Sequence, residues 1–492
     1  MTKKLNIFSP IKLFQKERLL FLFKDTIIYG GAAAISRAFS LITFPILARH
    51  FSVSDYGKLD FLLVISGFLS TLLIFGQDSA VARYFYEYKA IKSRKSLITQ
   101  SLIFQMSICI MIVPILYIFS AKISDLIFNY KNAHIYFQLI LLQIPFMILI
   151  NFSQNILKWT FKRSFFLFMS VGFAIVQATF IVIGTTTSDL NVKVVLVLYL
   201  SSNIIFAIVG LILIKDWLTF SFKKNYLKKL IPFAIPIGII CVLDSFIPVL
   251  ERNIIILTLD SEKLGLFSSG AKVAMLISII VSAFQMAWEP FCTSLHKEKN
   301  ASITFNFVLI TFCFLLCCLV LFIDLISKPL LIFLASYKYV NASDLIFPIA
   351  MAICIKAISG ITEVGISFSK KSYLYLYSHI LFITSLLIFL YFLIPKLGLL
   401  GVAISLLLAE IVRSLVSSFL AQRAFYLPWK YKPILLMLTI ILMTVTFTKL
   451  FLNVENIELK ILIYSSTLLF LISYYFILIK DMLIFSKIYN SK

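Results

Sequence analysis

Charged residues are scarce in this chain, and acidic residues are scarcer than basic ones. Only 14% of the 492 residues are charged, whereas 61% are hydrophobic and the mean hydropathy is +1.00. A soluble fold would expose much of that hydrophobic surface to water. The composition therefore excludes a soluble globular protein and predicts a membrane protein.

Several chemistries are also excluded by what is missing. The chain contains no Gly-x-x-x-x-Gly-Lys loop, which excludes direct use of ATP. Its four histidines are scattered, and its cysteines lie in or at the ends of apolar runs, a pattern typical of packing residues. We therefore expect no disulfide framework, no metal site, no catalytic residue and no cofactor. The cysteines are Cys109, Cys241, Cys292, Cys313, Cys317, Cys318 and Cys354.

The formal net charge is +23, but Lys and Arg are interleaved with apolar runs and form no basic domain. This argues against nucleic acid as a partner. Lys and Arg are concentrated in alternate connections, starting at the N-terminus, so the positive-inside rule predicts that both termini are cytoplasmic. Residues 1–24 are basic and lack an apolar core, and we interpret them as a cytoplasmic lead-in rather than a cleaved signal.

A helix that spans a membrane needs about 20 mostly apolar residues. The chain has fourteen candidate spans, joined by short connections. They lie near residues 25–48, 60–79, 97–120, 134–156, 164–183, 193–214, 231–257, 264–287, 302–323, 343–368, 373–394, 398–420, 432–450 and 460–480.

Polar signatures between the spans recur later in the chain, which indicates an internal duplication. They recur at offsets of 208 or 209 residues: Gly57 as Gly265, Tyr130-x-Asn132-Ala133 as Tyr339-x-Asn341-Ala342, and Lys162-Arg163-Ser164 as Lys370-Lys371-Ser372. Each copy holds six spans, an even number, so the two copies enter the membrane from the same side and are parallel repeats.

The predicted fold is an all-α polytopic membrane protein with two parallel six-helix repeats and two additional helices. Two such bundles can rock against each other, which makes alternating access the mechanism to test. The expected segments are the lead-in 1–24, a first bundle 25–214, a cytoplasmic linker 215–230, a second bundle 231–420, two further helices in 421–480 and a cytoplasmic tail 481–492.

Five basic residues fall inside the predicted spans: Arg37, Arg252, Lys272, Lys356 and Arg413. Each costs about 2.5–3.5 kcal/mol at the centre of a bilayer, so each must face a wet cavity or be paired. We expect Arg252 and Lys272 to meet at similar depth. Arg413 follows Glu410 by three residues, and we interpret these two as an intrahelical structural pair that tolerates exchange.

Acidic residues inside the spans are candidates for coupling transport to protons or sodium: Asp244, Glu251, Glu363 and Glu410. The alternative is that they only neutralise Arg252 or Lys272. Three prolines interrupt the span at 231–257, and we predict this span to be the moving element.

The segments Ser40–Arg49 (SLITFPILAR), Phe51–Gly57 (FSVSDYG) and Gly76–Phe85 (GQDSAVARYF) carry a family resemblance. They resemble the polysaccharide-unit (O-antigen, Wzx-type) flippases of the multidrug/oligosaccharidyl-lipid/polysaccharide exporter superfamily. That resemblance implies a non-enzymatic transporter in the bacterial inner membrane. Its implied activity is to move an undecaprenyl-diphosphate-linked oligosaccharide to the periplasmic leaflet, with membrane lipids, a polysaccharide polymerase and chain-length machinery as partners.

A diphosphate is densely anionic, and guanidinium and ammonium groups suit its oxygens. The substrate-binding candidates are therefore basic: Arg37, Arg49, Arg252, Lys272 and Lys356. Arg49, at the outer end of the first span, is either an interfacial residue that reaches towards water or, as the motif implies, a guard of the exit. A multidrug or cation antiporter of the same superfamily is the alternative, but it would be expected to line its cavity with carboxylates. A polymerase would be expected to have a large outer loop, whereas the longest expected here is Asp324–Ala342.

Overall fold

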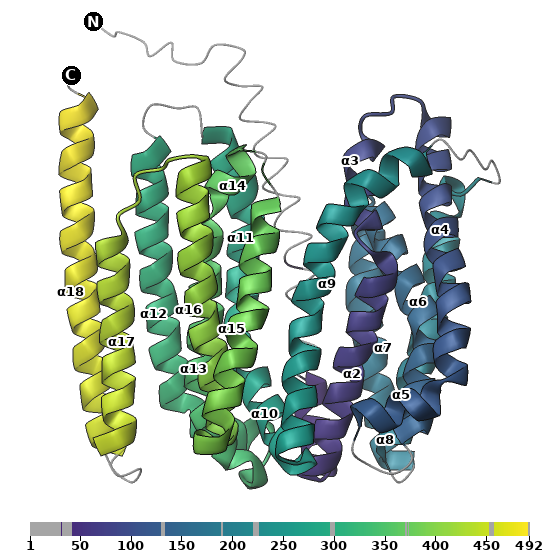
Figure 1. The fold of residues 1–492 in the computed structure, drawn as a ribbon, viewed down its shortest axis with the longest axis horizontal. Helices are drawn as coiled ribbons and strands as arrows, with labels where there is room; N and C mark the ends of the chain where they lie inside the picture. Colours follow the sequence, from purple (N-terminus) through teal and green to yellow (C-terminus); the bar gives the residue numbers. More distant parts are fainter. Residues whose placement is uncertain are drawn as a thin grey trace, which may run out of the picture.

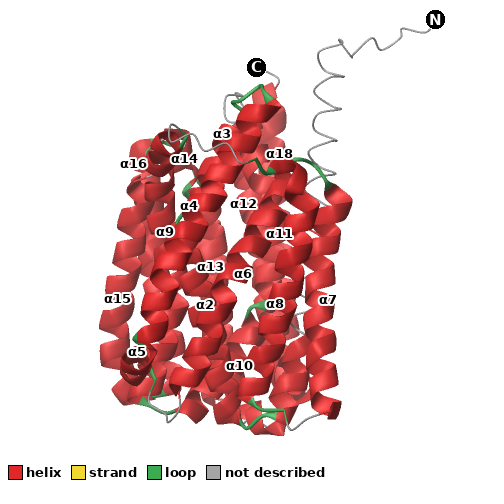
Figure 2. Ribbon diagram, turned by 90° about the vertical axis from the view of Figure 1, so that its right-hand side faces the viewer, coloured by secondary structure: helices red, strands yellow, loops and turns green. Residues whose placement is uncertain are grey.

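The structure is a computed structural model that describes residues 31, 42–128, 133–187, 190–219, 226–295, 301–369, 371, 373–451 and 457–490. Within these ranges the chain is helical and contains no strand, as Figure 2 shows. Thirteen of the helical segments described are long and apolar enough to cross a membrane. Each overlaps one predicted span, which confirms the fold class. Most of the span at 25–48, with Arg37, lies outside the described residues.

The first bundle contains the helical residues 42–50 and seven further helices. These are α2 (Val53–Ile74), α3 (Gln77–Phe85), α4 (Ile91–Ile118), α5 (Ser120–Ile127), α6 (Ala133–Trp159), α7 (Arg163–Thr187) and α8 (Val192–Ile214), followed by the short 3-10 helix η1 (Lys215–Trp217). Helix α6 packs against α2, α4, α5, α7 and α8 and so forms the centre of this bundle.

The second bundle contains eight α-helices and one 3-10 helix. These are α9 (Leu227–Thr258), α10 (Ser261–Ala274), α11 (Leu276–Leu295), α12 (Ala301–Leu334), η2 (Tyr337–Ala342), α13 (Ser343–Thr362), α14 (Val364–Ser369), α15 (Tyr373–Leu397) and α16 (Leu399–Ala424). Helix α13 packs against α10, α11, α12 and α16. Figure 1 shows the two bundles side by side, with α9 and α2 facing each other between them.

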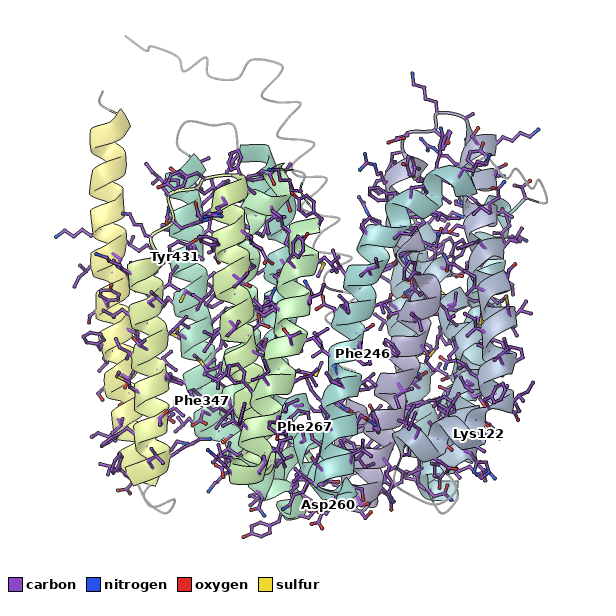
Figure 3. All side chains as sticks on the ribbon, viewed as in Figure 1. Lys122, Phe246, Asp260, Phe267, Phe347 and Tyr431 are labelled. Atoms are coloured by element: carbon purple, nitrogen blue, oxygen red, sulfur yellow. The ribbon has the colours of Figure 1, made fainter. Side chains whose placement is uncertain are left out.

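Two helices begin earlier than the predicted spans, and capping explains both. Helix α2 begins at Val53, not near residue 60, because the Ser52 side chain accepts the backbone N–H of Asp55 at 3.0 Å and caps the helix. Similarly, the Asp260 carboxylate accepts the N–H of Lys263 at 2.6 Å and starts α10. In Figure 3, Asp260 lies at the lower end of the molecule. This end, where α2 and α10 begin, is the predicted periplasmic side and is here called the outer end.

The bundles meet at the outer end through glycines of the duplicated motif. A Cβ atom on Gly57 would lie 2.5 Å from the Gly265 nitrogen, and one on Gly265 would lie 1.9 Å from the Val53 carbonyl oxygen. The backbones of α2 and α10 are therefore in direct contact, which only glycine permits. Beside this crossing, the hydroxyls of Ser54 and Ser261 are 2.7 Å apart. The repeated glycine is thus a packing feature that closes the outer end.

Helices α17 (Tyr431–Phe451) and α18 (Ile457–Asn490) pack against α12. Asp324 of α12 is 1% exposed and lies 3.0 Å from Lys460 Nζ and 3.4 Å from Lys449 Nζ. The Tyr464 hydroxyl donates to the same carboxylate at 2.6 Å. Asp324 was expected to begin an outer connection. That expectation is wrong, because α12 continues to Leu334. The Asp324 carboxylate instead binds side chains of the two additional helices.

Candidate substrate and coupling site

A buried ionic cluster joins the two bundles. Asp60 of α2 accepts a hydrogen bond from Arg252 Nε of α9 at 2.8 Å, and its other oxygen lies 3.8 Å from Lys272 Nζ of α10. Asp60 is 3% exposed and Arg252 is 6% exposed. Arg252 and Lys272 therefore meet, as expected, but they meet on a carboxylate of the opposite bundle. We call Asp60, Arg252, Lys272 and Glu251 the interbundle cluster.

Glu251 is the fourth member of the interbundle cluster, and one of its oxygens lies 4.0 Å from Arg252 Nη1. The guanidinium also lies 5.7 Å from the ring centre of Phe267, which Figure 3 labels on α10. Arg252 is thus enclosed by two carboxylates and an aromatic ring, which lowers the cost of a buried cation. Two formal positive and two formal negative charges balance within the cluster.

Asp60 was missing from the expected site residues. The predicted span started at residue 60, which placed this carboxylate at the membrane boundary. Because Ser52 starts α2 two turns earlier, Asp60 lies inside the helix instead. The helix cap was the signal in the sequence that could have revealed it.

A second cluster lies within the second bundle around Asp244 of α9. One oxygen of this carboxylate lies 3.1 Å from Lys356 Nζ of α13 and 3.3 Å from His379 Nε2 of α15. The Lys356 and Asp244 side chains are 50% and 39% exposed. Charged groups in membrane spans face protein or water rather than hydrocarbon. This pair therefore marks a water-accessible surface of the second bundle, on helix α9 that lies between the bundles.

A third cluster surrounds Arg413 of α16. Its Nη2 atom lies 2.6 Å from Glu410 and donates to the Ser359 hydroxyl at 2.8 Å, and its Nη1 atom lies 3.7 Å from Glu363. The expected pair of Glu410 and Arg413 is present. However, the pair is not self-contained, because Arg413 also contacts α13 and the segment that follows it.

Arg49 lies at the outer end and contacts the second bundle. Its Nη2 atom donates to the carbonyl oxygen of Phe333 at 2.5 Å. In the reverse direction, Lys338 of η2 donates to the carbonyl oxygens of Arg49, at 3.3 Å, and of Phe51. Tyr339 stacks edge-on against Tyr56, with 6.0 Å between ring centres. These contacts supplement the glycine crossing, so Arg49 belongs to the closed outer end in this state.

The first bundle forms a partly open cavity of about 660 Å³, lined by α2, α6, α7, α8 and the helical segment 42–50. Asp60 and Lys272 lie at its edge, so the interbundle cluster borders this space. Among the described residues, no group of three or more His, Cys, Asp or Glu side chains is arranged to hold a metal ion.

Known proteins share this architecture. The fold matches that of the lipid II flippase MurJ in an inward closed conformation, with a TM-score of 0.70 and 17% identity over 93% of this chain and 100% of that one. It also matches an outward-facing multidrug resistance MATE transporter of the MOP superfamily, with a TM-score of 0.58 and 16% identity over 82% and 94% of the two chains. An uncharacterized membrane protein of Haemophilus influenzae is 25% identical over 57% of this chain and 67% of its own length.

The fold and the paired bundles define a polytopic helical membrane protein with the architecture shared by these two structures. The profile of one sequence family, described as polysaccharide biosynthesis protein, matches residues 22–296. The chain belongs to this family of polysaccharide biosynthesis proteins.

Proposed function

We propose that this protein is a flippase that moves an undecaprenyl-diphosphate-linked oligosaccharide across the bacterial inner membrane by alternating access, for surface polysaccharide biosynthesis. The observation that carries the proposal is the interbundle cluster. Two cations of the second bundle share one carboxylate of the first, so a ligand that replaces this carboxylate also changes what holds the bundles together.

A diphosphate is suited to replace Asp60. Its oxygens accept the same hydrogen bonds from a guanidinium and an ammonium group, and they carry more negative charge than one carboxylate. Because a buried cation needs an anion at all times, the cluster exchanges one anion for another as substrate enters. Once Arg252 and Lys272 bind the diphosphate, Asp60 no longer joins α2 to α9 and α10, and the bundles are free to rearrange.

The closed outer end fits the first step of this cycle. With α2 and α10 in backbone contact at Gly57 and Gly265, this state admits substrate from the opposite, predicted cytoplasmic side. Separation of these helices would then release the substrate towards the periplasm. Arg49 contributes to the closure and would meet the departing diphosphate. A polysaccharide polymerase and chain-length machinery are the proposed acceptors of the product.

We further propose that protons drive the cycle through the cluster around Asp244. His379 directs Nδ1 at the Tyr375 carbonyl oxygen, at 2.7 Å, and Nε2 at the Asp244 carboxylate. The Tyr375 carbonyl oxygen and the ionised Asp244 carboxylate are both hydrogen-bond acceptors, so each can receive a ring nitrogen that carries a proton. The other charged groups in this region are Lys356, Glu363 and Arg413. A change in the protonation of this pair would change how Asp244 is held between Lys356 and His379.

The decisive experiment compares lipid-linked oligosaccharide translocation in proteoliposomes for wild type, Arg252→Gln, Lys272→Gln and the double variant. We expect each single variant to lose most activity and the double variant to lose all of it. Arg423→Gln is the matched control, because this cation lies at the end of α16 and contacts only the ring of Phe419 among the described aromatic residues. Normal translocation by the well-folded double variant would overturn the proposal and favour the cation antiporter, which drug-efflux assays on the same vesicles would detect.

A further inference from the structure

The cavity of the first bundle differs in chemistry from the three ionic clusters. Its lining includes five side-chain amides, contributed by α6, α7 and α8: Gln143, Asn151, Gln154, Gln177 and Asn203. Serine hydroxyls from α2 and α7 add to them. Polar side chains at this density are expensive in membrane spans and mark a space that holds water or a polar ligand.

Two of these amides keep their hydrogen-bonding capacity for a ligand. Gln143 donates to the Leu196 carbonyl oxygen at 3.1 Å and accepts from Asn203 at 3.3 Å, so this pair is fixed by the protein. In contrast, Gln154 and Gln177 make no hydrogen bond to any residue that the structure describes, although both are partly buried at the cavity wall. Each offers two donors and one acceptor oxygen to an occupant.

The cavity carries almost no charge. Among the described residues that line it, Asp60 and Lys272 are the only acidic and basic ones, and both belong to the interbundle cluster at its edge. The rest of the described wall therefore offers no carboxylate to a cationic drug and no further cation to a second phosphate. The lining also includes aromatic side chains, such as Phe166, Phe173 and Tyr199, which add apolar surface to the amides.

A wall that combines amide and hydroxyl groups with aromatic side chains is complementary to a neutral sugar, whose ring carries hydroxyls at its rim and C–H groups on its faces. The volume of about 660 Å³ lies in the range of about 300–1,000 Å³ that small-molecule sites occupy. We propose that the first bundle binds the uncharged sugar next to the diphosphate, with Gln154 and Gln177 as specificity-determining residues. This inference rests on the proposed function, and it assigns neutral hexoses and N-acetylated amino sugars rather than uronic acids to the site.

In this arrangement Lys272 lies where the diphosphate and the first sugar of the substrate are joined. Its ammonium group contacts Asp60 in the cluster and also lines the cavity. A substrate that places its diphosphate on Arg252 and Lys272 therefore directs its first sugar into the cavity of the first bundle. The charged part is held by the second bundle and the neutral part by the first.

The test measures binding of three lipids to the purified full-length protein in nanodiscs: undecaprenyl diphosphate alone, the same lipid bearing one N-acetylhexosamine, and the same lipid bearing one uronic acid. We expect the N-acetylhexosamine to tighten binding about tenfold and the uronic acid to give no gain. In the variant Gln154→Leu/Gln177→Leu, which keeps the side-chain volume close to the original, this gain should disappear while the bare diphosphate binds as before.

Gln138→Leu is the matched control, because this amide lies on the same helix as Gln154 but bonds Ser120 at 2.9 Å, away from the cavity. It should retain the full gain. Equal binding of the bare and the N-acetylhexosamine lipids to wild type would overturn the sugar site alone. Failure of all three lipids to bind would instead overturn the proposed function. Should the leucine variant fold poorly, protection of Gln177→Cys from a maleimide by the sugar-bearing lipid, but not by the bare one, reports the same contact.

Discussion

Replacing Gly265 by alanine tests whether the crossing of α2 and α10 closes the outer end. The new Cβ atom would lie 1.9 Å from the Val53 carbonyl oxygen, whereas ordinary van der Waals contact begins at 3.4 Å. The obstacle is backbone and no rotamer relieves it, so the helices must separate locally. Overpacking of this kind costs about 1–3 kcal/mol.

This cost falls on the closed state alone, because the contact is absent once α2 and α10 separate. A penalty of about 1–3 kcal/mol shifts the equilibrium between closed and open outer ends by about 5- to 150-fold. Gly265→Ala should therefore favour the outward-open state and slow transport at the step that returns the protein to this structure.

A cysteine at Ser268 reports the shift. Ser268 is completely buried and lies on the same face of α10 as Gly265, three residues further along the helix. We expect a membrane-impermeant maleimide added from the outer side to label Ser268→Cys faster when Gly265→Ala is present. The exposed native Cys241 is replaced beforehand to remove background labelling.

Gly67→Ala is the matched control. Gly67 lies on α2, the partner of α10 in the crossing, but a Cβ there would meet nothing within 4 Å. It should leave the labelling rate unchanged. If Gly265→Ala labels no faster than Gly67→Ala in protein that is equally well folded, the crossing does not form the outer closure.

Three further outcomes follow from the contacts. With cysteines at Ser54 and Ser261, whose hydroxyls are 2.7 Å apart, oxidation should form a disulfide that stops translocation until a reductant is added; full translocation by cross-linked protein would contradict the closure. Asp60→Asn should lower the free energy of unfolding by about 3–5 kcal/mol, because it removes the carboxylate that is hydrogen-bonded to the buried Arg252, and an unchanged melting temperature would refute the pairing. Exchange of Glu410 and Arg413 should also destabilise the protein, because it puts a carboxylate at position 413 beside Glu363, and unfolding by denaturant in detergent measures the loss.

Composition and the length of the apolar runs were sufficient to predict the membrane spans, because a run of about 20 apolar residues has few alternatives to crossing a bilayer. The repeated Gly57 and Gly265 were visible in the chain as a spacing. Their physical role was not visible, because it depends on two helices from different bundles approaching until only glycine fits. The pair of Glu410 and Arg413, in contrast, could be predicted from the sequence. Residues three apart on one helix are neighbours in any fold that keeps the helix.

The partners of the buried cations required the tertiary structure. Arg252 and Lys272 were expected to meet because depth in a span can be counted, but the carboxylate between them comes from α2, nearly two hundred residues away in the chain. The same holds for Asp244 with His379, and for the amides of the first cavity, which three helices bring together. The sequence determined that charges had to be buried and therefore paired. Which charges pair was decided by helix packing, because long-range contacts leave no periodic signal along the chain.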